Sequence, residues 1–302
     1  ALMKLIPDTP IYCTKKGEQI LRGLYHEDWN FVNVKQGDTL CIGDNTLHFI
    51  EAPMCHWPDT MMTYADKEQI LFSNDVFGQH YATESLYDDT VNQRDLFREA
   101  EKYYANILTI YNTNVKRKVD ELVKANLPLK MIAPSHGVIW TDHIKDIIGC
   151  YQKWDSNYQE DQVTIIYDTM WQATRRMAEQ IANGLRQAHP ETRVVLMNAT
   201  KDDKNDILLE TFRSREILVG CPTVNLGMTY AIAGILELIH GMRFKGKKAA
   251  VFTSFGWGGG VEKRIQQRLE EAGFEIAAEP LKVKWAPDSD AERQCREWGS
   301  AL

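Results

Sequence analysis

The chain has 302 residues, of which 44% are hydrophobic and 25% are charged. This composition is that of a globular protein, and the length predicts two domains. A net charge of -7 disfavours nucleic acid and anionic membranes as partners, because both need a basic face. No stretch approaches the roughly 18 apolar residues of a membrane span, and residues 1–7 do not resemble a secretion signal.

The cysteines are scattered along the chain, and none of them forms a C-x-x-C pair. They are Cys13, Cys41, Cys55, Cys150, Cys221 and Cys295. This spacing disfavours a disulfide scaffold and a zinc ribbon. We therefore expect thiols in a reducing cytoplasm.

The first half of the chain mixes short apolar runs with amphipathic segments. Strands are predicted at residues 39–42, 47–51, 61–64 and 70–72, and helices at residues 96–108 and 116–125. The short spacing between the strands indicates that this half contains more hairpins than the second.

Three potential metal ligands in this half each follow a strand-like run, at a turn: His56, Asp75 and His136. Imidazole and carboxylate groups together suit iron, manganese or zinc. Any one of the three, taken alone, is more typical of a structural histidine or a turn-forming aspartate. Their residue types leave both interpretations open.

A polar stretch at residues 151–162 separates two differently patterned halves and predicts a domain boundary. After it, short apolar strands alternate with amphipathic helices. Strands are predicted at residues 163–167, 194–197, 217–220, 249–252 and 282–284, and helices at residues 173–188, 206–212, 232–239 and 261–272. This order predicts an α/β fold with a parallel sheet covered on both faces, which binds ligands at the carboxyl ends of its strands.

Loops of suggestive composition follow three of these strands. Residues 167–174 place hydroxyl groups before a helix, where unpaired N–H groups and the helix dipole favour an anion. Residues 220–227 form a turn, and residues 253–260 combine glycines with Trp257, which offers a stacking face. Taken singly, the loops fit helix capping, a simple turn and a flexible loop with a core tryptophan. Jointly, they predict one crevice.

The segment from residue 163 to about 285 resembles a short-chain flavodoxin domain, with the three loops in that family's order. The resemblance implies a doubly wound, five-stranded parallel sheet in a domain spanning 162–302 that binds FMN. The first loop would hold the phosphate, and the other two would flank the isoalloxazine ring. The implied cofactor-binding residues are Thr169, Met170, Trp171, Gln172, Ala173 and Thr174, then Pro222, Thr223 and Asn225, then Thr253, Ser254, Phe255, Gly256, Trp257 and Gly258.

The whole chain resembles the flavodiiron protein family and, within it, the bacterial flavorubredoxins that reduce nitric oxide. Stretches that carry the resemblance are residues 6–13, 56–59, 73–75 and 103–107. The resemblance implies that 1–155 form a metallo-β-lactamase-like αββα domain. In it His56 would bind one iron, His136 the other, and Asp75 would bridge them.

The family's remaining ligands come from an H-x-E-x-D motif that does not occur in this sequence. His26 is the nearest imitation, and we interpret it as a surface residue. His80 and Tyr104 are candidates for groups beside the metal, or for ordinary packing residues. The chain also contains no C-x-x-C pairs of a rubredoxin module. We expect an N-terminally truncated metal domain whose diiron site is absent or incomplete, since an ordinary site needs about four ligands per metal.

The resemblance implies an oxidoreductase that passes electrons from a rubredoxin or rubredoxin reductase-type donor through FMN to a non-heme diiron site, where nitric oxide or oxygen is reduced. It also implies a cytoplasmic head-to-tail homodimer or tetramer, in which one subunit's flavin lies beside the other's iron. A second hypothesis is a truncated FMN-binding electron-transfer protein with no functional metal centre. A metallo-β-lactamase-type hydrolase is a weaker third hypothesis, because it needs the same missing ligands.

Overall fold

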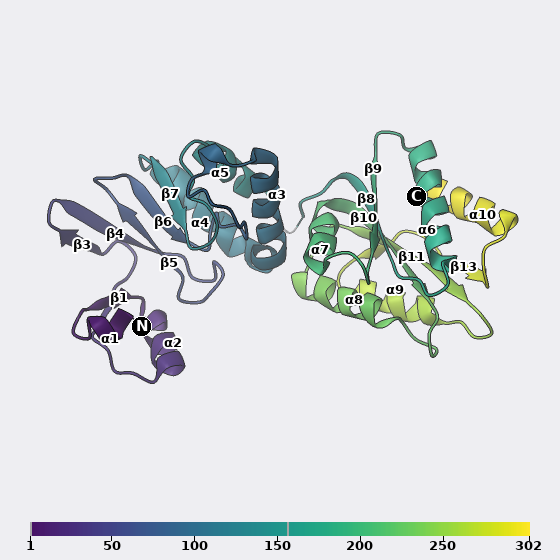
Figure 1. Cartoon of the computed structure of the whole chain (residues 1–302), viewed down its shortest axis with the longest axis horizontal. Helices are drawn as coiled ribbons and strands as arrows, with labels where there is room; N and C mark the ends of the chain where they lie inside the picture. Colours follow the sequence, from purple (N-terminus) through teal and green to yellow (C-terminus); the bar gives the residue numbers. More distant parts are fainter. Residues whose placement is uncertain (1, 156) are drawn as a thin grey trace. The chain divides into compact units, whose positions relative to one another are not determined.

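The computed structural model describes residues 2–155 and 157–302. The chain divides into two compact units, Ala1–Asp155 and Ser156–Leu302, each built around its own sheet (Figure 1). None of the helices within the described ranges is long and apolar enough to cross a membrane.

A five-stranded mixed sheet, in the order β3-β4-β5-β6-β7, forms the centre of the first unit. Its strands are β3 (Thr39–Ile42), β4 (Asn45–Glu51), β5 (Met61–Ala65), β6 (Ile70–Asn74) and β7 (Met131–Pro134). Neighbours from β3 to β6 are antiparallel, whereas β7 pairs parallel to β6. Strands β4, β6 and β7 therefore run in one direction, and the loops that follow them leave the same edge of the sheet.

Helices that follow β6 in the chain pack their apolar stripes into this unit. They are α3 (Gln93–Tyr103), α4 (Asn112–Ala125) and α5 (Ile144–Lys153). In α3, the buried Leu96, Ala100 and Tyr103 recur at the three- and four-residue spacing of one helix face. The single helix predicted at 96–108 is interrupted, because a π-helical turn (Tyr104–Leu108) and a 3-10 turn (Thr109–Tyr111) connect α3 to α4.

The N-terminal part of the unit forms a second, two-stranded parallel sheet. Its elements are α1 (Leu2–Leu5), β1 (Ile11–Cys13), α2 (Lys15–Tyr25) and β2 (Phe31–Asn33). Helix α2 connects the two strands and is capped by the Thr14 hydroxyl, which accepts a hydrogen bond from the Gly17 N–H. The sequence pattern did not predict these elements.

The second unit contains a parallel sheet in the order β12-β11-β10-β8-β9, with β13 also paired to β11. The strands are β8 (Glu160–Tyr167), β9 (Arg193–Asn198), β10 (Ser214–Pro222), β11 (Lys248–Phe255), β12 (Glu275–Ile276) and β13 (Leu281–Lys284). Strand β12 pairs with the start of β11 and β13 with its end, so six strands fill five positions. The predicted doubly wound parallel sheet is confirmed, with its last position divided between two short strands.

Helices cover both faces of this sheet: α6 (Ala173–Ala188), α7 (Lys204–Arg213), α8 (Tyr230–Met242), α9 (Val261–Glu271) and α10 (Ser289–Ser300). Helices α6 and α10 lie side by side, and α8 and α9 lie on the opposite face (Figure 1). The first pair is in close contact, because a Cβ added at Gly184 would lie 2.0 Å from the Arg296 carbonyl oxygen. Strand β8 begins at Glu160, inside the stretch predicted as a polar boundary, and its Gln162 is fully buried.

Candidate functional site

A pocket of about 510 Å³ lies at the carboxyl edge of the second sheet, where β8, β10 and β11 are neighbours. The loops that follow these strands form most of its wall. Of the residues predicted to bind flavin, it is lined by Thr169, Met170, Trp171, Ala173, Thr174, Pro222, Thr223, Asn225, Ser254, Phe255, Gly256, Trp257 and Gly258. The sequence prediction thus identified three loops that the fold places around one cavity.

Helix α6 begins directly beside this cavity without a side-chain cap. Its N-cap position, Gln172, has a left-handed backbone (φ 66°) and makes no capping hydrogen bond. Capping by Thr169 or Thr174, the simpler sequence interpretation, is therefore not observed. Instead, the Thr174 and Ser254 hydroxyls are hydrogen-bonded at 2.8 Å, and the buried Thr169 hydroxyl has no partner among the described residues. Uncapped N–H groups and an unpaired hydroxyl fit a phosphate.

Aromatic side chains form the rim of the pocket. Trp257 is 94% exposed and Trp171 is 87% exposed, so neither is a core tryptophan. The Trp257 ring centroid lies 6.3 Å from that of Trp285, a pocket residue that sequence reasoning missed. A Cβ on Gly256 would lie 2.9 Å from the Trp285 ring, so glycine permits this close approach. Flat, exposed ring faces around a cavity suit a planar aromatic ligand.

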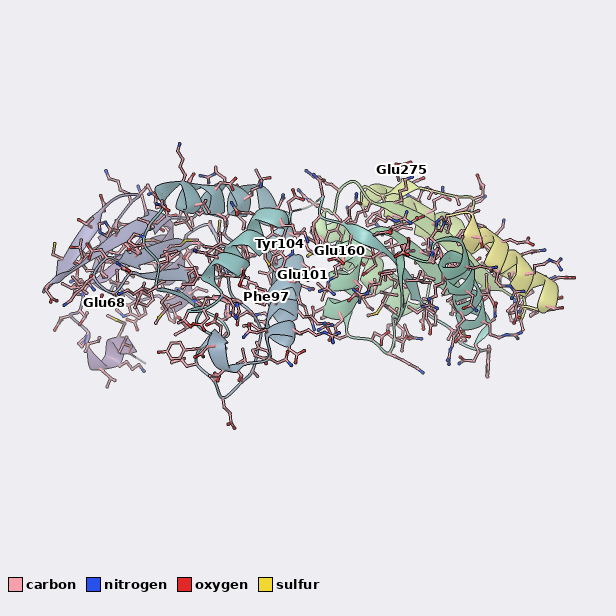
Figure 2. The ribbon with its side chains drawn as sticks, turned by 90° about the horizontal axis from the view of Figure 1, so that it is seen from above. Glu68, Phe97, Glu101, Tyr104, Glu160 and Glu275 are labelled. Atoms are coloured by element: carbon pink, nitrogen blue, oxygen red, sulfur yellow. The ribbon has the colours of Figure 1, made fainter. Side chains whose placement is uncertain are left out.

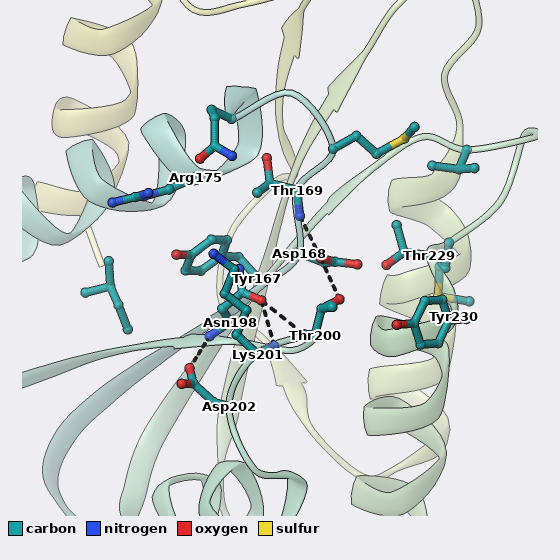
Figure 3. A pocket seen from close by; sticks show the side chains of 15 residues that line it. Tyr167, Asp168, Thr169, Arg175, Asn198, Thr200, Lys201, Asp202, Thr229 and Tyr230 are labelled. Atoms are coloured by element: carbon teal, nitrogen blue, oxygen red, sulfur yellow. Dashed lines mark hydrogen bonds between the residues drawn. The ribbon is translucent and has the colours of Figure 1, made fainter.

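Two predicted flavin residues do not line this pocket. Thr253 is buried within β11. Gln172 lines a neighbouring pocket of about 650 Å³, shaped by the loops after β8 and β9 and the start of α8 (Figure 3). There the Asp168 carboxylate accepts hydrogen bonds from the Thr169 N–H at 2.8 Å and the Thr200 hydroxyl at 3.0 Å, which connects the two loops.

In the first unit, the structure brings together the three predicted metal ligands from separate loops. The buried Asp75 carboxylate lies between two imidazoles. Its Oδ2 is 3.6 Å from His56 Nε2, and its Oδ1 is 3.3 Å from His136 Nε2. They meet because the parallel strands β4, β6 and β7 deliver their following loops to the same sheet edge.

The chemistry of these donors fits part of a two-metal centre. No group of three or more His, Cys, Asp and Glu side chains in the described parts of the chain has an arrangement that could hold a metal ion. Instead, His56 and His136 approach different oxygens of Asp75, as expected for a carboxylate that bridges two ions. Two donors at about 2.1 Å from a shared ion can be at most ~4.2 Å apart, and both measured distances are shorter. The three side chains could therefore hold two iron ions jointly through four donor atoms, two imidazole nitrogens and the two Asp75 oxygens.

The structure favours a different one of the two sequence interpretations for each of His80 and Tyr104. His80 does lie beside His136, with ring centroids 5.4 Å apart, and burial lowers its pKa, as does His136. Tyr104, however, is a packing residue among the helices of the first unit (Figure 2), and its hydroxyl donates to the Trp154 carbonyl at 2.9 Å. Its neighbour Tyr103 lies nearer, with its ring 5.9 Å from that of His136.

His26, the nearest imitation of the missing motif, is exposed. It ends α2 in a left-handed conformation (φ 55°), and its N–H donates to the Arg22 carbonyl. This position agrees with a surface residue and is remote in the sequence from the three clustered ligands.

Two family descriptions match the two halves of the chain. Residues 1–137 match the ODP family beta lactamase, and residues 165–299 match flavodoxin. The anaerobic nitric oxide reductase flavorubredoxins of Vibrio vulnificus and Escherichia coli K12 are 50% and 49% identical to the whole chain. The chain spans only 61% and 63% of the length of these two relatives.

Two solved structures superpose on nearly the whole chain. The rubredoxin oxygen:oxidoreductase of Desulfovibrio gigas has a TM-score of 0.91 and 32% identity, over 96% of this chain and 73% of its own. The flavodiiron protein of Giardia intestinalis has a TM-score of 0.91 and 32% identity, over 97% of this chain and 72% of its own. Both the lactamase-like and the flavodoxin-like halves therefore occur in one chain among its relatives, in the same order.

Proposed function

The chain belongs to the flavodiiron protein family, and we propose that it is an oxidoreductase that carries electrons from a rubredoxin-type donor through FMN to a non-heme diiron site. Nitric oxide or oxygen would be the reduced substrate. The names of its relatives support both choices, since they include nitric oxide reductase flavorubredoxin and rubredoxin oxygen:oxidoreductase. The observation that carries the proposal is the Asp75 carboxylate held between His56 and His136.

The pocket of the second unit would bind FMN through two kinds of contact. The N–H groups at the start of α6, which no N-cap side chain bonds, and the Thr169 hydroxyl, which has no partner among the described residues, would hold the phosphate. The loops after β10 and β11 would flank the ring, with Trp257 offering a stacking face. The hydrogen bond between Thr174 and Ser254 joins the phosphate loop to the ring loop and would keep the pocket in shape.

The first unit would bind the metal ions through His56, Asp75 and His136. FMN, when bound, can pass electrons on singly, and a pair of iron ions can bind a diatomic gas and supply those electrons to it. The chain's own task is positioning: Asp75 is buried, so its two oxygens are held at set distances from the two imidazoles.

The exposed rim of the pocket supports a docking partner. Trp171, Leu226 and Trp257 line the pocket and are all more than two-thirds exposed, and large exposed apolar groups mark interaction surfaces. We assign this rim to the electron donor or to a second copy of the chain in a head-to-tail homodimer or tetramer, which light scattering can test.

The six cysteines are free thiols, which supports a cytoplasmic location.

The decisive test is the iron and FMN content of the purified chain, measured by metal analysis and absorbance. We expect one FMN and fewer than two irons per chain, because His56, Asp75 and His136 leave each ion short of the four ligands of an ordinary site. One FMN with no iron would support the second hypothesis, an electron-transfer protein without a metal centre. A chain that binds neither would contradict both hypotheses.

A further inference from the structure

A glutamine links the two loops that carry His136 and Asp75. The side chain of Gln79 is fully buried. Its Oε1 accepts a hydrogen bond from the Val138 N–H at 2.8 Å, and its Nε2 donates to the Val138 carbonyl at 3.1 Å. The Gln79 main-chain N–H also donates to the His136 carbonyl at 3.2 Å. One residue of the Asp75 loop therefore contacts the main chain on both sides of Gly137.

Gly137 allows this contact. A Cβ at this position would lie 1.7 Å from Gln79 Oε1, and the backbone adopts a left-handed conformation (φ 81°). A side chain here would both be strained and displace the glutamine amide. The glycine and the glutamine are thus matched: the first leaves the space that the second fills.

Further hydrogen bonds connect the loop that carries Asp75 to the loop that carries His136. The Ser135 N–H donates to the Asn74 carbonyl at 2.7 Å, and the Trp140 indole donates to the Phe77 carbonyl at 2.7 Å. The first contact lies where β6 and β7 end, and the second lies beyond Val138 in the His136 loop. Between these contacts, the Gln79 amide hydrogen-bonds to the main chain at Val138.

We propose that Gln79 is a positioning residue, which sets the separation between the His136 imidazole and the Asp75 carboxylate before metal binds. The inference rests on the proposed function and deepens it. An uncharged amide suits this task, because it pairs with both main-chain groups of Val138 without competing with the ligands for the metal. Groups that orient metal ligands typically change metal affinity about 10- to 100-fold when they are removed.

The test compares two substitutions in the full chain. Gln79→Met keeps the length of the side chain and removes its hydrogen bonds. Gln162→Met makes the same change at another fully buried glutamine, which hydrogen-bonds to Glu210 in the second unit. The dissociation constant for Co²⁺ is measured by absorbance, and hydrogen exchange at the Val138 amide is measured without metal.

We expect Gln79→Met to weaken Co²⁺ binding at least 10-fold and to speed exchange at Val138, while Gln162→Met leaves both unchanged. A Gln79→Met chain that binds Co²⁺ within twofold of the wild type would overturn the proposal, since packing alone would then suffice. If the wild type binds no Co²⁺, the assignment of the metal ligands fails. The exchange rate at Val138 then tests whether Gln79 links the two loops. Faster exchange at Val138 in Gln79→Met would then support the link between the loops, and unchanged exchange would overturn it.

Discussion

Replacing Thr169 by valine should change the affinity for flavin without destabilising the fold. The Thr169 hydroxyl is buried and has no hydrogen-bond partner among the described residues, yet the side chain lines the predicted phosphate loop. Valine has nearly the same shape and lacks the hydroxyl. The substitution should therefore weaken FMN binding and leave the flavin-free chain as stable as before, or more stable.

Both effects can be estimated from the same hydroxyl. A hydrogen bond to a charged acceptor is worth about 1.5–3 kcal/mol, and roughly 1.4 kcal/mol corresponds to a tenfold change in affinity. Thr169→Val should raise the Kd for FMN by about 10- to 100-fold. In the flavin-free chain, a buried hydroxyl without a partner costs about 1–3 kcal/mol, so its removal should not lower the free energy of unfolding.

The assay is an FMN fluorescence titration together with urea unfolding of the flavin-free chain. Thr253→Val is the matched comparison, because Thr253 also has a buried hydroxyl without a described partner but does not line the pocket. It should preserve the Kd. An unchanged Kd in Thr169→Val would refute the assignment of the phosphate loop, and an equal weakening in Thr253→Val would refute the distinction between the two threonines.

Three further predictions concern the metal centre and the stability of each unit. Asp75→Ala should abolish iron binding while FMN content stays at the wild-type level, and His26→Ala should change neither; metal analysis of the purified variants checks this. Burial raises the pKa of Asp88, but hydrogen bonds from the loop beside it outweigh that effect and lower the pKa overall. The ionised carboxylate therefore stabilises the fold above its unfolded pKa of about 3.9, and this contribution is lost as the pH falls further. Asp88→Asn should lower the unfolding temperature at pH 7, with a smaller difference from the wild type at pH 3; an equal difference at both would contradict the charge argument. Gly184→Ala should cost about 1–3 kcal/mol in urea unfolding, because its Cβ would overlap α10, whereas Gly149→Ala in α5 meets open space and should be neutral or slightly stabilising.

The second unit was largely predictable because its strands are short, apolar and separated by amphipathic helices. The helix predicted at 173–188 has those bounds as α6, and each predicted strand lies within an observed one. Helix α10 was missed for a physical reason. It fully buries only Cys295 and Gly299, and Gly299 permits a close approach to α6 that leaves no periodic pattern in the sequence.

The first unit was harder to predict because its elements are short or interrupted. Strands β1 and β2 have three residues each, too few for an alternating pattern to be recognised. The π-helical turn after Tyr103 also defeats a regular helical repeat. At this junction, Tyr103 lies beside His136 while Tyr104 packs into the core.

The sequence by itself determined the two-part organisation and predicted the chemistry of each site. Loop composition and family resemblance predict His56, Asp75 and His136 as potential ligands and three loops as a flavin pocket, because these predictions depend on residue types at strand ends. Only the tertiary structure decided which side chains meet. Sheet order places Trp285 in the pocket and Thr253 outside it, and the pairing of β6 with β7 brings Gln79 against the His136 loop. Contacts between residues far apart in the chain depend on the packing of whole elements, which no local pattern records.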